Sequence, residues 1–215
     1  MATTSAPFGF RLARQPSVHA TPRPFPLLSG YAVTLQHGDP VNLLGTIGTT
    51  SNGGTVGLAT TDQTRTGTVA SGVPVLGIFV GCEYTDSDGK PVKDRQWTAS
   101  TATFGSANAI AWVIEGDQNE FVVQADGAIG TIEIGGQYDM IGFAAAGSTV
   151  TKTSATMLNT TTGPIADDAQ GQFQVLEFVE DGKNTQADTY PLVVVRIASP
   201  QLGRAGRTAQ NAAGT

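Results

Sequence analysis

The sequence predicts an all-β protein with a compact β-sandwich or β-barrel body, jelly-roll-like, and an extended N-terminal arm. Three observations predict this class. The 215 residues include 27 glycines, which supply the positive φ angles of tight turns. Short runs rich in Val, Ile, Thr and aromatic residues stand between those turns, and such residues fit a pleated sheet. Hydrophobic residues make up 40% of the chain and charged residues 14%, so there is enough apolar material for a core.

Residues 1–30 are expected to form the arm. Five of the eleven prolines fall within the first 26 positions. Each lacks a backbone donor and restrains its neighbour to extended conformations, so neither a helix nor a central strand is expected. Two placements are open: the segment lies back over its own body, or it docks on another chain with its arginines facing carboxylates. The side chains expected to make such a contact are Phe8, Phe10, Arg11, Arg14, Arg23 and Phe25.

The body is expected to span residues 31–198 and to begin with a hairpin. Tyr31–Leu35 and Val41–Leu44 are the expected strands, and Gly38, Asp39 and Pro40 are the turn between them. Residues 45–72 are rich in Gly, Thr and Ser, which indicates an exposed loop or a long hairpin.

Val75–Cys82 is the strongest strand candidate, because it is apolar on both faces and therefore suits the centre of the core. It leads into a turn at Thr85–Gly89. Its core residues are Leu76, Ile78, Phe79, Val80 and Cys82. Further strands are expected at Thr55–Leu58, Ala109–Ile114, Glu120–Gln124, Tyr138–Phe143, Gln172–Val179 and Leu192–Ile197. Regular turns between short strands indicate a sandwich or barrel.

Residues 199–215 are expected to be a flexible tail, because they contain a single large aliphatic side chain. This tail and residues 1–30 together carry five of the twelve basic residues and none of the eighteen acidic ones. The remaining seven bases against eighteen acids give residues 31–200 a net charge of −11. An acidic body repels phosphate groups, so nucleic acid is not expected as a partner.

The sequence contains no recognisable catalytic, metal or cofactor site. Cys82 is the single cysteine, and the two histidines, His19 and His37, lack the spacing of a metal pair. The acidic turn at Asp86–Gly89 lacks the later ligands of a calcium loop. An enzyme on this fold would need a nucleophile–base pair or converging acids in a pocket. The expectation is therefore a non-enzymatic protein without catalytic residues, metal ligands or cofactor, and without a membrane or small-molecule substrate as partner.

Aromatic residues leave one binding alternative open. Trp97, Trp112, Tyr84 and Tyr138 could form a sugar-stacking platform on a β-face, as in a carbohydrate-binding module. The other interpretation is that these side chains pack in the core and at its rim.

Several segments together resemble the cement, or head decoration, proteins of tailed bacteriophages, especially those of podovirus-type and siphovirus-type cyanophages and marine phages. The resemblance runs in order from about residue 7 to residue 198, and residues 45–72 depart from it. The segments that carry it are Pro7–Arg11, Val75–Asp86 with the following Gly-Lys-Pro, Phe121–Gly127, Gln172–Asp181 and Leu192–Ile197.

The resemblance implies a structural role on the virion. Proteins of this family have a β-rich body, are commonly trimeric over local three-fold positions of the head, and grip the coat with an extended N-terminal arm. By this resemblance the chain is expected to be made in the host cytoplasm, to bind the major capsid protein as a homo-trimer on the outer capsid surface, and to use the arm residues named above as its contact. The alternative is another phage surface β-module, such as a head fibre base or a receptor- or carbohydrate-binding protein.

Overall fold

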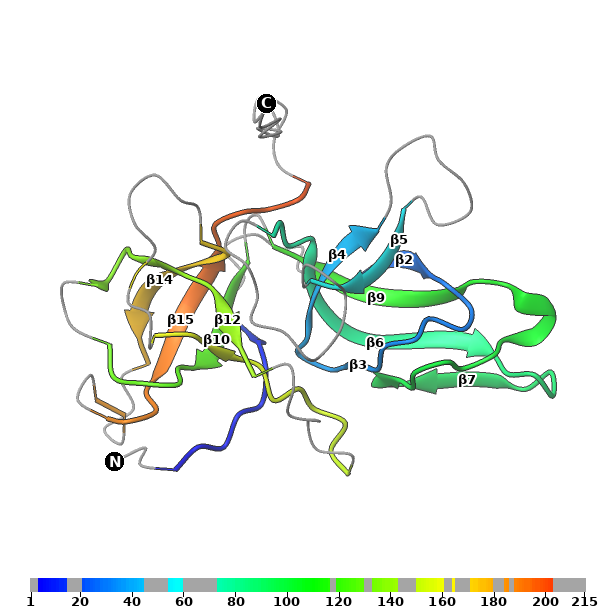
Figure 1. The fold of residues 1–215 in the computed structure, drawn as a ribbon, viewed down its shortest axis with the longest axis horizontal. Coiled ribbons are helices and arrows are strands. Elements are labelled where there is room, and N and C mark those ends of the chain that lie inside the picture. The colour runs from blue at the N-terminus through cyan, green and yellow to red at the C-terminus, as the bar shows by residue number, and fades with distance from the viewer. Residues whose placement is uncertain are drawn as a thin grey trace.

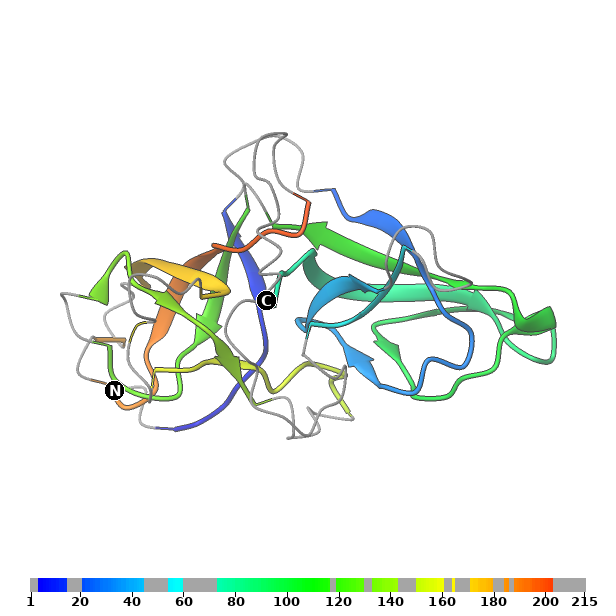
Figure 2. The same cartoon turned by 45° about the horizontal axis from the view of Figure 1, so that its top comes forward.

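The computed structural model describes residues 4–14, 21–44, 54–59, 73–116, 119–129, 133–142, 150–160, 164, 171–179, 184–185 and 188–202. Fifteen strands and one short 3-10 helix make up the regular structure of these residues, and the sheets are antiparallel throughout. The all-β class is therefore confirmed. Figures 1 and 2 show two β-units side by side in an elongated molecule, and the arrangement is consistent with a sandwich. In the described part no sheet closes into a barrel.

The first unit comprises the described residues from 21 to 116. Its main sheet has the strand order β2-β9-β6-β4-β5, with β7 paired to β6, and the short ladder β3-β8 lies beside it. The predicted central strand is β6, which pairs with β9 on one side and with β4 and β7 on the other. The strands are β2 (Arg23–Leu27), β3 (Leu35–Gln36), β4 (Pro40–Leu44), β5 (Thr55–Leu58), β6 (Gly77–Thr85), β7 (Pro91–Asp94), β8 (Gln96–Trp97) and β9 (Ala109–Glu115), with the 3-10 helix η1 at Phe104–Ser106.

The second unit comprises residues 4–14 and the described residues from 119 to 202. Its five-stranded sheet has the order β1-β10-β15-β14-β11, and β12 pairs with β13 beside it. Register shifts in the β1–β10 and β14–β15 pairs mark irregular positions within the sheet. The strands are β1 (Arg11–Arg14), β10 (Glu120–Gln124), β11 (Gln137–Tyr138), β12 (Met140–Ile141), β13 (Met157–Leu158), β14 (Phe173–Phe178) and β15 (Leu192–Ile197).

The N-terminal segment is extended, but the described part of it is not an arm separate from the body. Strand β1 pairs with β10 of the second unit, and β2 pairs with β9 of the first unit over five residues. Of the two placements that the sequence allowed, the described residues take the one in which the segment lies on its own chain. Residues 1–3 and 15–20 lie outside the described residues.

Edge positions explain how a proline-rich segment forms strands. Both β1 and β2 are the last strands of their sheets, so each pairs on one side only. In β2, Pro24 and Pro26 stand at alternate positions, and both can therefore face away from β9, where no N–H donor is needed. The prolines that argued against a central strand are compatible with an edge strand, and they also prevent another strand from pairing there.

The expected opening hairpin does not form. Gln36 and Asp39 do make a tight turn, in which Asp39 N–H donates to the Gln36 carbonyl. The flanking strands nevertheless take distant partners, because β3 pairs with β8, while β4 pairs with β5 and β6. The expected Tyr138–Phe143 strand is similarly divided into β11 and β12 at the buried Asp139, and residue 143 lies outside the described part.

The two units share one continuous hydrophobic core and are joined by buried polar contacts. The Asp39 carboxylate of the first unit is fully buried and accepts hydrogen bonds from Gln36 N–H, at 2.7 Å, and from the Ser154 hydroxyl of the second unit, at 2.5 Å. At the surface of the junction, Lys152 of the second unit also pairs with Asp94 of the first, with 2.5 Å between Nζ and Oδ2. Because buried polar groups are costly unless they are paired, the contacts of Asp39 favour one arrangement of the two units.

The first residues of the expected C-terminal tail also belong to the body. Val75 N–H donates to the Ser199 carbonyl, and the Gln201 side-chain amide donates to the Leu43 carbonyl. Residues 199–202 therefore pack across the junction onto the first unit, and the expected tail from residue 203 onward lies outside the described residues.

Candidate functional site

The Pro7–Arg11 segment, which carries the resemblance to cement proteins, is built into the junction between the units. Gly9 has a φ of +71°, and a Cβ there would lie 2.6 Å from Ser154 Cβ and 2.8 Å from the Gly38 carbonyl oxygen. Only glycine fits such a position. The next residue, Phe10, is fully buried and stacks on Phe173, with 4.3 Å between ring centroids. The motif therefore fastens the N-terminal segment to both units.

Four of the six predicted contact residues remain at or near the surface in two aromatic–guanidinium pairs. Arg11 lies over the Phe8 ring, 4.3 Å from its centroid, and Arg23 lies 5.7 Å from the Phe25 centroid. Arg23 also pairs with Glu115, with 2.7 Å between the charged atoms. Phe10 is a core residue and not part of the exposed surface of the segment. Arg14 ends β1, and its side chain lies outside the described part.

A cavity of about 460 Å³, the junction cavity, opens where the two units meet. Two exposed guanidinium groups, those of Arg11 and Arg95, stand at this cavity. Among the described residues, no carboxylate lies within ion-pair distance of either group. The apolar lining consists of Phe10, Leu12, Ile78, Val80, Ile114 and Phe121. An apolar cavity with unpaired cations suits a ligand that combines an apolar group with an anion.

His37 adds a titratable group to the junction cavity. Its Nδ1 is buried without a hydrogen-bond partner in the described part. Burial lowers the pKa of His37 below its ordinary value, and the nearby positive charges of Arg95 and Arg11 lower it further. The imidazole is therefore neutral at pH 7, and it can accept a hydrogen bond or donate one without adding charge.

A second cavity, of about 540 Å³, adjoins the first, since Val80 and Arg95 line both. Trp112 and Cys82 also line it. The Cys82 thiol lies 3.4 Å from the Gln96 carbonyl oxygen, and burial raises the pKa of this thiol to about 12. Cys82 is thus a packed core residue at neutral pH and not a nucleophile.

The predicted core residues lie on β6, apart from Leu76, which directly precedes this strand. Leu76, Ile78, Phe79 and Cys82 are each at most 2% exposed, while Val80 is partly buried against the core. Val80 stands at the register shift between β6 and β9, which places it beside the two cavities.

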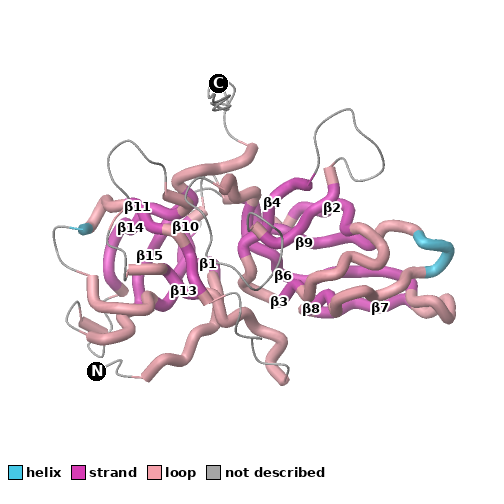
Figure 3. The backbone as a smooth tube through the Cα atoms, in the orientation of Figure 1, coloured by secondary structure: helices cyan, strands magenta, loops and turns pink. Residues whose placement is uncertain are grey.

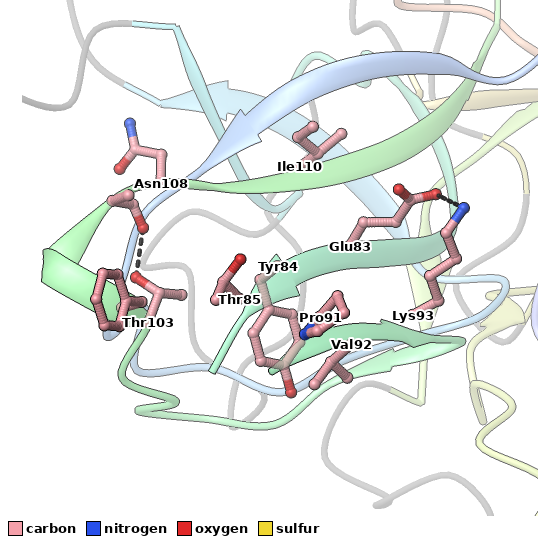
Figure 4. A pocket seen from close by; sticks show the side chains of 11 residues that line it. Glu83, Tyr84, Thr85, Pro91, Val92, Lys93, Thr103, Asn108 and Ile110 are labelled. Atoms are coloured by element: carbon pink, nitrogen blue, oxygen red, sulfur yellow. Dashed lines mark hydrogen bonds and ion pairs between the residues drawn. The ribbon is translucent and has the colours of Figure 1, made fainter. Parts of the chain in front are cut away.

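A third cavity, of about 390 Å³, is lined by residues of β6, β7, η1 and the start of β9, at the end of the first unit that points away from the second unit in Figure 1; Figure 4 shows its lining. Tyr84, Pro91 and Val92 form one side of it, and Ile110 lies opposite. Phe104 of η1 is 59% exposed at this end, which Figure 3 shows as the cyan turn on the right. Large exposed apolar side chains that gather at one place indicate a contact surface.

The loop that presents Phe104 is held in a fixed and strained form. The Thr103 hydroxyl donates to the Ala107 carbonyl and lies 2.8 Å from the Ser29 hydroxyl. Ser106 has a φ of +58°, a conformation that costs a residue with a Cβ about 1–2 kcal/mol. Strain of this kind persists only where the surrounding contacts impose it, and it is concentrated at functional positions.

The sugar-stacking platform is not formed. Trp97 and Tyr138 are fully buried and lie in different units. Tyr84 packs edge-on against Trp97, and the Trp112 indole donates to Glu83. The four side chains therefore do not share an exposed face.

Arg95, Phe104 and the place of His37 at the junction were not predicted from the sequence. The signal for Phe104 was present, since it is an isolated aromatic in the polar stretch from residue 98 to residue 108. Within the described ranges, no group of three or more His, Cys, Asp or Glu side chains is placed to hold a metal ion. No helix in the described part is both long and apolar enough to cross a membrane.

None of the family models, curated proteins or solved structures compared with this chain matches it.

Proposed function

We propose that this protein is a structural cement protein of a tailed-phage head, which binds the outer capsid surface as a homo-trimer and stabilises contacts between major capsid protein subunits. The observation that carries the proposal is the form of the Pro7–Arg11 motif. Gly9 and Phe10 fix the motif in the body, while Phe8 and Arg11 are left at the surface as a stacked pair.

Preformed aromatic–guanidinium pairs are suitable anchors for a protein partner. Arginine and aromatic side chains dominate the binding energy of many interfaces, and each pair presents a ring and a cation together. Arg23 and Phe25 lie on β2, which pairs with β9. Arg11 begins β1, which pairs with β10, and Phe8 lies three residues before it. Little conformational entropy would be lost when they dock.

This mechanism differs from the flexible clamp that the sequence suggested. The described residues of the N-terminal segment are ordered against the body before any contact with a coat. Binding would then rely on a preformed surface. In a trimer, once one copy is bound the other two are held near the coat at a high effective concentration, so the avidity of the trimer exceeds the affinity of a single modest contact.

The test must leave the fold intact, so deletion of residues 2–29 is unsuitable because it would remove both β1 and β2. The double variant Phe8→Ala/Arg23→Ala removes one member of each surface pair. Val150→Ala is the matched control, because Val150 is 90% exposed and belongs to neither pair. Co-sedimentation with expanded phage heads that lack the protein measures binding.

We expect the double variant to bind at least about tenfold more weakly than the control, which corresponds to about 1.4 kcal/mol. Circular dichroism of both variants establishes that the fold is unchanged. Undiminished binding of a folded double variant, or failure of the unaltered protein to bind heads, would overturn the proposal.

A further inference from the structure

The outer end of the first unit presents an apolar group and an anion together. Asp86 forms a bridge with Thr103, which brings the β6–β7 turn next to the loop that carries Phe104. Asp86 Oδ1 accepts the backbone N–H groups of Asp88 and Lys90, so this turn is fixed by its own side chain. Asp88 is exposed at its tip, and no cation of the described residues lies within ion-pair distance of its carboxylate. We call the group formed by residues 86–89 and Phe104 the acidic tip.

The junction cavity offers the opposite combination. Its lining is apolar, and the exposed guanidinium groups of Arg11 and Arg95, which pair with no carboxylate of the described residues, stand at it. Its volume of about 460 Å³ is ample for a phenyl ring, since a cavity of about 150 Å³ already takes up benzene. The buried Nδ1 of His37 has no hydrogen-bond partner among the described residues, so it adds a polar group to the cavity.

These two surfaces lie at different places on the chain, and the acidic tip points away from the junction in Figures 1 and 3. The tip cannot reach the junction cavity of its own molecule without unfolding β6 and β9, which lead from the junction to the tip. Any contact between the two surfaces must therefore join two molecules.

We propose that the acidic tip of one copy docks in the junction cavity of a second copy, with the Phe104 ring against the apolar lining and the Asp88 carboxylate on Arg95. Charge complementarity is the argument for a second copy as the occupant. Residues 31–200 carry a net charge of −11, so two copies repel each other except where a basic site receives an acid. The basic site at the junction is matched by the exposed Asp88 carboxylate of the tip.

The contact is heterologous, because the surface that each copy offers differs from the surface that it receives. Such contacts generate closed rings if the rotation between copies closes, and open filaments if it does not.

A charge exchange tests the proposal on the purified full-length chain, without capsids. Sedimentation equilibrium and light scattering give the molar mass of the unaltered protein and of Asp88→Arg, Arg95→Glu and the double variant Asp88→Arg/Arg95→Glu. Asp88 contributes only its backbone N–H to the turn, so replacement of its side chain preserves the turn. Phe104→Ala removes the apolar half of the contact, and Val150→Ala is the control.

We expect the unaltered protein and the Val150→Ala control to self-associate. Each single charge variant and Phe104→Ala should weaken the association at least tenfold, and the double charge variant should restore it. The association should also weaken with added salt, because an exposed ion pair is screened.

A monomeric unaltered protein would overturn the proposal, and so would single variants that associate as the unaltered protein does. Single variants that dissociate without rescue in the double variant would show that Asp88 and Arg95 do not meet, which also overturns it. Head binding does not enter this test, so its failure would leave the proposed capsid contact of Phe8 and Arg23 to be judged by its own experiment.

Discussion

Phe10 ties the N-terminal segment to the core, and the variant Phe10→Ala measures what this contact contributes to stability. The side chain is 0% exposed and stacks on Phe173 at 4.3 Å. Truncation of a buried phenylalanine costs about 3–5 kcal/mol, and loss of the stacked pair accounts for about 0.5–1.5 kcal/mol beyond burial alone. We therefore expect the free energy of unfolding to fall by about 3–5 kcal/mol.

Urea unfolding followed by circular dichroism gives this free energy, and thermal unfolding gives an independent value. For a chain of this length each kcal/mol shifts Tm by roughly 2–4 °C, so Tm should fall by about 6–20 °C. Val150→Ala should change stability by less than about 0.5 kcal/mol, because Val150 is 90% exposed. A Phe10→Ala variant as stable as this control would refute the integration of the segment and would restore the free arm.

Three further outcomes follow from buried groups. The Cys82 thiol, with a pKa raised by burial to about 12, should remain unmodified by a thiol reagent at pH 8 in the folded protein and should react once the protein is unfolded in urea; rapid labelling of the folded protein would contradict this. Burial and the charges of Arg95 and Arg11 lower the pKa of His37 in the folded protein, so the His37 imidazole binds a proton more readily in the unfolded chain than in the folded one. The contribution of neutral His37 to the free energy of unfolding is therefore fully present above about pH 6.5 and is lost as the pH falls through the lowered pKa. Between pH 7.5 and 5, the free energy of unfolding of His37→Gln, measured in urea, should decrease less than that of the unaltered protein. An equal decrease in both proteins would assign the loss to other groups. Ser154→Ala should reduce the free energy of unfolding by about 1–3 kcal/mol, since it removes a donor to the buried Asp39 carboxylate; an unchanged urea midpoint would mean that this buried contact contributes nothing.

Local patterns were sufficient to predict most of the long strands. Val75–Cys82 is apolar on both faces because the first part of β6 is buried on both faces, and the strand was predicted with bounds two to three residues before the observed Gly77–Thr85. Strands β10 and β15 have the predicted bounds. The turn at Thr85–Gly89 was also predicted, because Asp and Gly there fix a hairpin by local geometry.

The rest depended on contacts between distant residues. The proline pattern of the first 30 residues excludes a central strand but does not distinguish a free arm from an edge strand. In both, the prolines can lie where the backbone does not need to donate an N–H to a neighbouring strand. Phe10 looks like a surface anchor in the sequence, and only its contact with Phe173 makes it a core residue. The junction cavity could not be predicted, because its lining combines residues near positions 11, 37, 78, 95 and 121.

The position of β1 also affects the order in which the protein can fold during synthesis. The partner of Phe10 is Phe173, which leaves the ribosome 163 residues later, or roughly 8–33 s at 5–20 residues per second. The described strands from β2 to β9 lie together in the chain and have their partners sooner. The emerging chain must therefore carry Phe10 without its stacking partner while the first unit assembles, and the Phe10–Phe173 contact forms only when β14 arrives.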